Sequence, residues 1–332
     1  VLQVVTLLLL LPSVLSFAPS QRTPADLLTL QSAATGEEDS QIYLKMLQCN
    51  EKTKACFAGK SILLTGASGG LGSTLAKQLA SCQVDTLILS GRKKEALEKV
   101  AKECQSLSTS TSIHIITCDL ADKESVRKLG EEALALCGVV DVLINNGGVS
   151  SRSDFLDTQL EVDERIMQIN FFSGASLAKA VVPKMVENKS GKVIWISSVQ
   201  GLIGIPSRTS YAASKFAVQG YCESLRAEMA SSGVTVHVAS PGYIRTGLSL
   251  AALTGDGKPH GQMDETTANG ADPNEVAVNT LDNVAKGKAD FVLAASFSSQ
   301  VAIWLRLLFP SVLQKLLVKR FDKAKEIKDK ND

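Results

Sequence analysis

Short apolar runs recur through the middle of the chain, and longer segments of helical length separate them. A short run of apolar and β-branched residues bounded by turn residues is typical of a strand buried on both faces. Strands that alternate with helices form a parallel sheet covered by helices on both sides. We therefore expect an α/β protein built on a single doubly wound sheet of the Rossmann type. The expected strands are Ser61–Thr65, Thr86–Leu89, Ile113–Thr117, Val139–Ile144, Lys192–Ser197, Val234–Ala239 and Phe291–Leu293.

This pattern predicts one domain over residues 41–296, because no Pro- or Ser-rich linker divides it. The composition, 45% hydrophobic with a formal charge of +1, is that of a globular protein, and so small a charge gives no electrostatic reason for a nucleic-acid partner. The seven cysteines are scattered and include no Cys-x-x-Cys pair, which argues against a disulfide framework and against a zinc site. We expect no metal.

Residues 1–40 are predicted to be a targeting segment and linker. Val1–Phe17 is nearly all apolar, too short to span a bilayer comfortably, and resembles the core of a signal peptide, with Val14 and Ser16 at small-residue cleavage positions. Residues 16–19, with the sequence SFAP, also resemble the cleavage motif of plastid-targeting presequences in algae with secondary plastids. The first interpretation predicts an endomembrane location such as the endoplasmic reticulum, and the second a plastid reached by a bipartite signal. An uncleaved anchor is the alternative to cleavage.

Residues 297–332 are predicted to be an amphipathic helical extension. Pro310 follows a first apolar stretch, Val301–Leu308, and interrupts the helix there. In the second helix an apolar face lies opposite a basic one, as in helices that bind a membrane surface. Packing on the protein's own core or on a second subunit, as in a homodimer, is the alternative. The apolar face comprises Val312, Leu313, Leu316, Leu317 and Phe321, and the polar face Gln314, Lys315, Lys319 and Arg320.

A glycine-rich turn follows the first expected strand. Ser61–Thr65 leads into Gly66–Gly72, with the sequence GASGGLG, and a helical pattern follows. Glycines let the backbone approach a pyrophosphate, and a helix N-terminus supplies N–H groups and the positive end of its dipole. The strand, turn and helix together predict a dinucleotide-binding loop.

The second expected strand runs into Arg92, near the position where NAD-binding folds usually have an acidic residue that holds the ribose 2′-hydroxyl. This chain has no carboxylate there and continues with Lys93 and Lys94. A guanidinium fork suits a 2′-phosphate, so the sequence predicts NADP(H) as the preferred cofactor, with NAD(H) as the alternative.

Tyr211 and Lys215 are four residues apart and so share one face of a helix. A free phenol titrates near pH ~10, too high for ready proton exchange at neutral pH. An ammonium ~4 Å away, at an effective dielectric of ~20, stabilises the phenolate by roughly 4 kcal/mol before desolvation is subtracted. We therefore expect Lys215 to lower the pKa of Tyr211 by up to about three pKa units.

Further polar residues follow the other expected strands, where open α/β sheets bind their ligands. Asn170, in contrast, lies within a helical stretch. The strand-end residues are Asp119 after the third strand, Asn145–Gly148 after the fourth, Ser198 after the fifth and Pro241–Thr246 after the sixth.

On these residues the chain resembles the short-chain dehydrogenases/reductases, over about Gly59 to Leu293. That family usually has alanine at the position of Gly147. The segments Asn145–Ser153 and Trp304–Pro310 are similar to a subgroup regarded as membrane-associated, the dehydrogenase/reductase members 7 and 7B. The motifs that carry the resemblance are Thr65–Gly72, Asn145–Gly148, Asn170, Ser198, Tyr211–Lys215 and Pro241–Thr246.

The resemblance implies a role for each site residue. Tyr211 would be the general acid in reduction and the base in oxidation, while Lys215 lowers its pKa and holds the nicotinamide ribose. Ser198 would bind the substrate carbonyl oxygen, and Asn170 would position a water in the proton relay. The implied cofactor-binding residues are Gly66, Ser68, Gly69, Gly70, Leu71, Gly72, Arg92, Asp119 (at the adenine), Leu120, Asn146, Tyr211, Lys215 and Thr246 (at the nicotinamide amide or the pyrophosphate).

The expected function is NADPH-dependent interconversion of a carbonyl and a secondary alcohol by hydride transfer. A dehydratase or epimerase on a related fold, and a cofactor-binding partner protein without turnover, are the alternatives. An apolar tail near a membrane favours a lipophilic substrate such as a steroid, a retinoid or a fatty-acyl ketone. We expect residues 247–270 to line the substrate pocket.

Overall fold

The computed structural model describes residues 49–329. The predicted targeting segment, residues 1–40, lies outside the described residues, as do the first residues of the predicted domain. Expectations about cleavage and about the N-terminal anchor therefore stay predictions.

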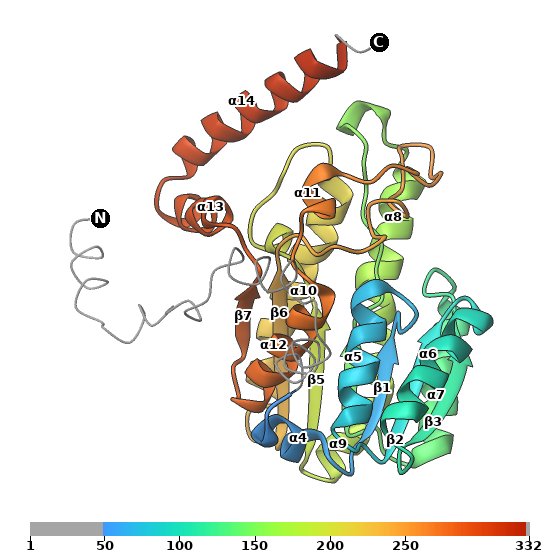
Figure 1. Cartoon of the computed structure of the whole chain (residues 1–332). Coiled ribbons are helices and arrows are strands. Elements are labelled where there is room, and N and C mark those ends of the chain that lie inside the picture. Colours follow the sequence, from blue (N-terminus) through green and yellow to red (C-terminus); the bar gives the residue numbers. More distant parts are fainter. Residues whose placement is uncertain (1–48, 330–332) are drawn as a thin grey trace, which may run out of the picture. The chain divides into compact units, whose positions relative to one another are not determined.

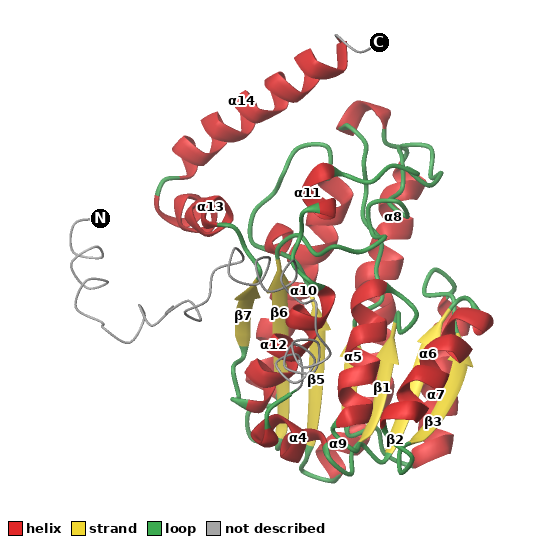
Figure 2. Cartoon of the chain, viewed as in Figure 1, coloured by secondary structure: helices red, strands yellow, loops and turns green. Residues whose placement is uncertain are grey.

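A seven-stranded sheet forms the centre of the domain, in the order β3-β2-β1-β4-β5-β6-β7, and every pair of neighbouring strands is parallel. Helices cover both faces of the sheet (Figure 2). The predicted fold class is confirmed. The strands are β1 Ser61–Thr65, β2 Thr86–Gly91, β3 Ser112–Thr117, β4 Val142–Asn145, β5 Gly191–Ile196, β6 Val234–Pro241 and β7 Asp290–Leu293.

The fourth strand begins at Val142, three residues later than expected. Val139 and Val140 are apolar, but they belong to the turn that follows Gly138, which has a φ of 68° and ends the preceding helix.

The longer helices are α4 Glu51–Phe57, α5 Gly70–Ser81, α6 Lys94–Leu107, α7 Lys123–Cys137, α8 Leu160–Met167, α9 Ser173–Glu187, α10 Thr209–Glu228, α12 Pro273–Ala285, α13 Phe297–Leu308 and α14 Pro310–Asp329. The short ones are η2 Phe155–Asp157, the π-helix η3 Gln168–Phe172, η4 Val199–Gly201 and α11 Glu265–Ala268.

The core lies on both faces of the sheet because successive residues of a strand point to opposite sides. In β1, Ile62 and Leu64 belong to a cluster that includes residues of α5 and α12, whereas Leu63 belongs to a cluster with residues of α9 and α10. All three are fully buried, and each such side chain contributes about 1.5–3 kcal/mol relative to an exposed one. Because all neighbouring strands are parallel, their carboxyl ends meet at one edge of the sheet.

The C-terminal extension forms the two predicted helices, α13 and α14, with the break at Pro310 (Figure 1). Leu313 of α14 is buried, Leu317 is half-buried, and Val312 and Leu316 are exposed. Within residues 49–329, no helix has both the length and the apolar character needed to cross a membrane.

Candidate active site

A cavity of about 610 Å³ lies at the carboxyl ends of the strands. Every residue that the sequence predicted to bind cofactor lines it, and so does Ser198, whereas Asn170 does not. Five residues of the stretch 247–270 also reach this cavity, and their expected role in lining a substrate pocket stays a prediction. These are Gly247, Leu248, Ser249, Ala251 and Thr267.

The glycine turn after β1 is too tight for side chains. Gly66 has a φ of +64°, and a Cβ there would lie 2.7 Å from the Cα of Gly147. At Gly72 a Cβ would lie 2.0 Å from the carbonyl oxygen of Gly66. The N-cap of α5, Gly69, offers no side-chain acceptor to the first N–H groups of the helix. Those groups face the cavity, so the turn fits a pyrophosphate.

Hydrogen bonds tie the glycine turn to the turn after β4. The hydroxyl of Thr65 accepts the N–H groups of Asn146 and Gly147, at 3.1 and 3.0 Å. The side-chain amide of Asn146 donates back to the carbonyl oxygens of Thr65 and Gly66, at 3.0 and 3.2 Å. At Gly147 a Cβ would lie 2.4 Å from a methyl of Leu120, so the glycine leaves room for Leu120 at the cavity wall.

At the far end of the cavity, the exposed Arg92 follows β2, and none of the residues that the structure describes pairs with it. Ser90, the residue that sequence reasoning missed here, is buried and lines the cavity. Its hydroxyl has no hydrogen-bond partner among the described residues. Only its place at the end of a strand could have suggested it.

Tyr211, Lys215 and Ser198 are buried together at the other end of the cavity. Helix α10 carries Tyr211 and Lys215 on one face, as predicted, and Ser198 is the N-cap of η4. The Nζ of Lys215 donates to the carbonyl oxygen of Ile196 at 2.9 Å and lies 5.7 Å from the centre of the Tyr211 ring. The three side chains therefore form one cluster.

The predicted direction of the Tyr211 pKa was wrong. Burial raises the pKa of the phenol above its ordinary value, and a hydrogen bond with Ser198 and the charges of Arg152 and Arg208 oppose this rise only in part. Burial also lowers the pKa of Lys215, to about 8. The sequence argument counted the attraction between the two groups and underestimated the desolvation of both.

Asn170 lies in the π-helix η3, behind the cavity wall. Its amide nitrogen donates to the carbonyl oxygen of Val149 and to the hydroxyl of Ser214, both at 2.9 Å. Its amide oxygen accepts the N–H of Val149 at 2.8 Å. Both amide hydrogens are therefore used within the protein, and the side chain fixes the segment after β4 against α10. The predicted role in holding a water stays a prediction.

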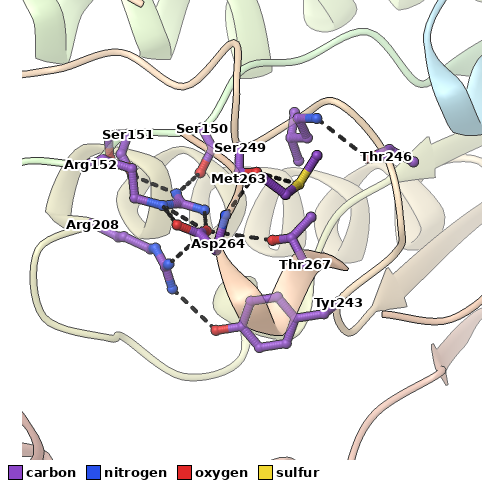
Figure 3. A network of polar contacts seen from close by, with 11 residues as sticks. Ser150, Ser151, Arg152, Arg208, Tyr243, Thr246, Ser249, Met263, Asp264 and Thr267 are labelled. Atoms are coloured by element: carbon purple, nitrogen blue, oxygen red, sulfur yellow. Dashed lines mark hydrogen bonds and ion pairs between the residues drawn. The ribbon is translucent and has the colours of Figure 1, made fainter. Parts of the chain in front are cut away.

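A polar network joins Arg152 and Tyr243, two residues that line the cavity, to Arg208 and Asp264 (Figure 3). The guanidinium of Arg152 donates to Asp264 at 3.0 Å, and that of Arg208 reaches Asp264 at 3.4 Å and the hydroxyl of Tyr243 at 3.1 Å. Burial alone would raise the pKa of Asp264, but the hydrogen bond and charge of Arg152, with the charge of Arg208, lower it. Sequence reasoning missed this network, because its members are far apart in the chain and follow no spacing rule.

Known proteins are similar to this chain in sequence and in fold. A family model described as short chain dehydrogenase matches residues 60–254. A dehydrogenase/reductase SDR family protein 7-like of Anopheles gambiae is 44% identical over 270 residues, which are 80% of this chain and 84% of that protein. The chain belongs to the short-chain dehydrogenase family. The dehydrogenase/reductase SDR family member 7B of Mus musculus is 40% identical to it, over 83% of this chain and 86% of that protein. The expected similarity to members 7 and 7B is confirmed.

Solved structures share the fold of this short-chain dehydrogenase. A short-chain dehydrogenase/reductase from Burkholderia phymatum in complex with NAD has a TM-score of 0.67 at 21% identity, over 77% of this chain and 95% of that one. A short-chain dehydrogenase from Sphingobium yanoikuyae in complex with NADPH has a TM-score of 0.64 at 24% identity, over 78% and 95%. Helices α13 and α14 lie beyond the stretch that the family model matches.

Proposed function

We propose that this short-chain dehydrogenase interconverts a carbonyl compound and a secondary alcohol with a nicotinamide cofactor. The observation that carries the proposal is the buried cluster of Ser198, Tyr211 and Lys215 in a cavity whose other end is a glycine cradle. Bound there, the cofactor would supply or accept the hydride. Lys215 would hold the nicotinamide ribose, and the N-terminus of α5 the pyrophosphate.

Tyr211 would give a proton to the substrate oxygen in reduction. Burial raises the pKa of the phenol and so keeps it protonated at neutral pH, as a proton donor must be. Ser198 and Tyr211 would donate hydrogen bonds to the oxygen on which negative charge develops. The charges of Arg152 and Arg208 would limit the cost of the phenolate that remains.

A panel of ketones and aldehydes tests the proposal, with NADPH consumption followed by absorbance. We expect turnover by the wild type and its near-complete loss in Tyr211→Phe, which keeps the ring and removes the proton. A protein that binds NADPH and reduces no carbonyl would be the non-catalytic partner protein, and a Tyr211→Phe enzyme with substantial turnover would show that another acid acts.

The preference for NADP(H) is also a proposal. The exposed guanidinium of Arg92 at the cavity edge would pair with the 2′-phosphate, and the buried hydroxyl of Ser90 lies two residues before it. We expect NADPH to bind at least ~10-fold more tightly than NADH, a difference of ~1.4 kcal/mol. Titration by intrinsic fluorescence measures both. Arg92→Gln should remove most of the preference and Lys94→Gln little of it; equal affinities in the wild type would contradict the role of Arg92.

A membrane surface is the partner that we propose for the extension. An interfacial helix needs exposed apolar residues flanked by lysines, and α13 and α14 have both. We place the enzyme at an endomembrane such as the endoplasmic reticulum, with the plastid as the alternative. The exposed residues are Phe297, Trp304, Leu307, Leu308, Phe309, Val312, Leu316 and Val318, with Lys315, Lys319 and Lys323 beside them.

Flotation of the full chain with vesicles that contain an anionic lipid tests this partner. Val312→Glu with Leu316→Glu should release the protein, because both side chains are exposed on α14. Leu107→Glu, at an equally exposed leucine of α6, should leave it bound. Equal binding by both variants would show that another surface makes the contact.

A further inference from the structure

The end of the chain contributes to the same cavity as the catalytic cluster. Leu317 and Arg320 of α14 line it, together with Ala302 of α13, although the family model ends at residue 254. The cavity that Tyr211 borders is therefore bounded on one side by the C-terminal extension. An extension that served only to bind a membrane would not need to reach the site.

Two arginines of the extension, Arg306 and Arg320, interact with residues of the catalytic domain. The guanidinium of Arg306 in α13 lies 4.6 Å from the centre of the Phe216 ring, and Phe216 follows Lys215 directly in α10. In α14, the charge of Arg320 acts on Tyr243: burial raises the pKa of that phenol, but Arg208 and Arg320 together lower it below its ordinary value. Tyr243 thus joins the extension to the network of Arg208 and Asp264 (Figure 3).

Helix α14 has an inner and an outer apolar side. Leu313 is only 7% exposed and Leu317 is half-buried at the cavity, whereas Leu316 is 52% exposed. Apolar residues from other parts of the chain line the cavity as well, among them Ile203 and Ile205 after η4. We call Leu317 and these isoleucines the apolar compartment of the cavity, which the polar catalytic cluster also lines.

We propose that α14 is a wall of the substrate site and that Leu317 determines how large a substrate the enzyme accepts. This inference rests on the proposed carbonyl reduction and names its substrate class. The substrate is a ketone with its oxygen at Ser198 and Tyr211 and an extended apolar group that packs against Leu317. Such a group would lose contact with water along its length, which favours long apolar ketones over short ones.

A series of methyl ketones of increasing chain length, reduced with NADPH by the full-length enzyme, tests the inference. Leu317→Trp fills the compartment and should raise KM for the longest ketones at least ~10-fold, equal to ~1.4 kcal/mol of binding. It should leave KM for the shortest ketone and the affinity for NADPH unchanged, and Leu317→Ala should extend the range to bulkier ketones. Leu316→Trp and Leu316→Ala, at the exposed neighbour, are the matched controls. If KM depends on ketone chain length in the same way for the Leu317 and the Leu316 variants, the inference is overturned.

A second readout does not depend on turnover. Leu317→Cys and Leu316→Cys are each introduced into the full chain, and their rates of reaction with a maleimide are compared after subtraction of the wild-type rate. We expect Leu317→Cys to react several-fold more slowly; equal rates would show that α14 does not lie against the cavity. If Leu317→Cys reacts slowly but the enzyme reduces no ketone, the proposed carbonyl reduction is refuted and the position of α14 is not. The affinity of each variant for the ketones, measured by fluorescence quenching, then replaces KM in the comparison.

Discussion

Replacement of Lys215 by methionine should stabilise the cofactor-free protein at neutral pH. The ammonium of Lys215 is buried, and its pKa falls from the ordinary 10.5 to about 8. At ~1.4 kcal/mol per pKa unit, keeping this group charged costs the folded state about 3.5 kcal/mol. Methionine has a similar length and carries no charge. It also removes the hydrogen bond to the carbonyl oxygen of Ile196, a loss of roughly 1–3 kcal/mol, so the expected net gain is about 1 kcal/mol.

The pH dependence of this gain in stability distinguishes the effect of removing the buried charge from any effect on packing. Since the pKa of Lys215 is lower in the folded state, the unfolded state binds more protons between pH 8 and 10.5, and wild-type stability rises with pH in that range. The cost of burying the charge is complete below pH 8 and disappears above 10.5. The advantage of Lys215→Met should therefore shrink by roughly 2 kcal/mol from pH ~7 to pH ~9.5 and reverse in sign.

Urea unfolding of the cofactor-free protein at several pH values measures the two stabilities. Lys102→Met, at an exposed lysine of α6, is the control and should change stability by less than ~0.5 kcal/mol at every pH. A Lys215→Met protein that is less stable than wild type at neutral pH, with a difference that does not vary with pH, would refute the reasoning.

Three further substitutions should change the affinity for the cofactor or the pH dependence of the rate. Gly72→Ala should weaken NADPH binding at least ~10-fold in a fluorescence titration, because its Cβ would lie 2.0 Å from a backbone oxygen of the turn; unchanged affinity would show that the turn can relax. Arg208→Gln should move the pH–rate profile of alcohol oxidation towards higher pH, since its charge lowers the pKa of Tyr211; an unmoved profile would remove that influence. Gly147→Ala should displace Leu120 and reduce the affinity for the adenosine part of the cofactor. The affinity is measured with a 2′-phosphorylated adenosine nucleotide, and an affinity equal to that of the wild type would contradict the contact between residue 147 and Leu120.

The sheet and the glycine turn could be predicted because both follow from local pattern. Short apolar runs alternate with helices, and the turn after β1 carries glycine where a Cβ would collide. The pairing of Tyr211 with Lys215 needed only helical spacing. Their pKa values could not be predicted, because the direction of a shift depends on how completely the fold removes each group from water.

Other parts of the site depend on contacts that leave no pattern in the sequence. Asp264 meets Arg152 and Arg208 across long stretches of chain, and Leu317 reaches the cavity from the far C-terminus. The amphipathic pattern of α14 showed that one side is apolar, but only the fold shows that Leu317 turns inward while Leu316 stays exposed.

The bonds between Thr65 and Asn146 have a consequence for the order in which the site is assembled. Each joins residues about 80 positions apart, and Gly70 lies against Thr246, still further along the chain. During synthesis the glycine turn therefore leaves the ribosome long before the residues that fix its shape. Such distant pairings slow folding, because loop entropy is lost before the contacts form. A nucleotide can thus be held only by a chain that extends past Asn146, and an amino-terminal fragment cut before Asn146 should gain no protection from proteases when NADPH is added.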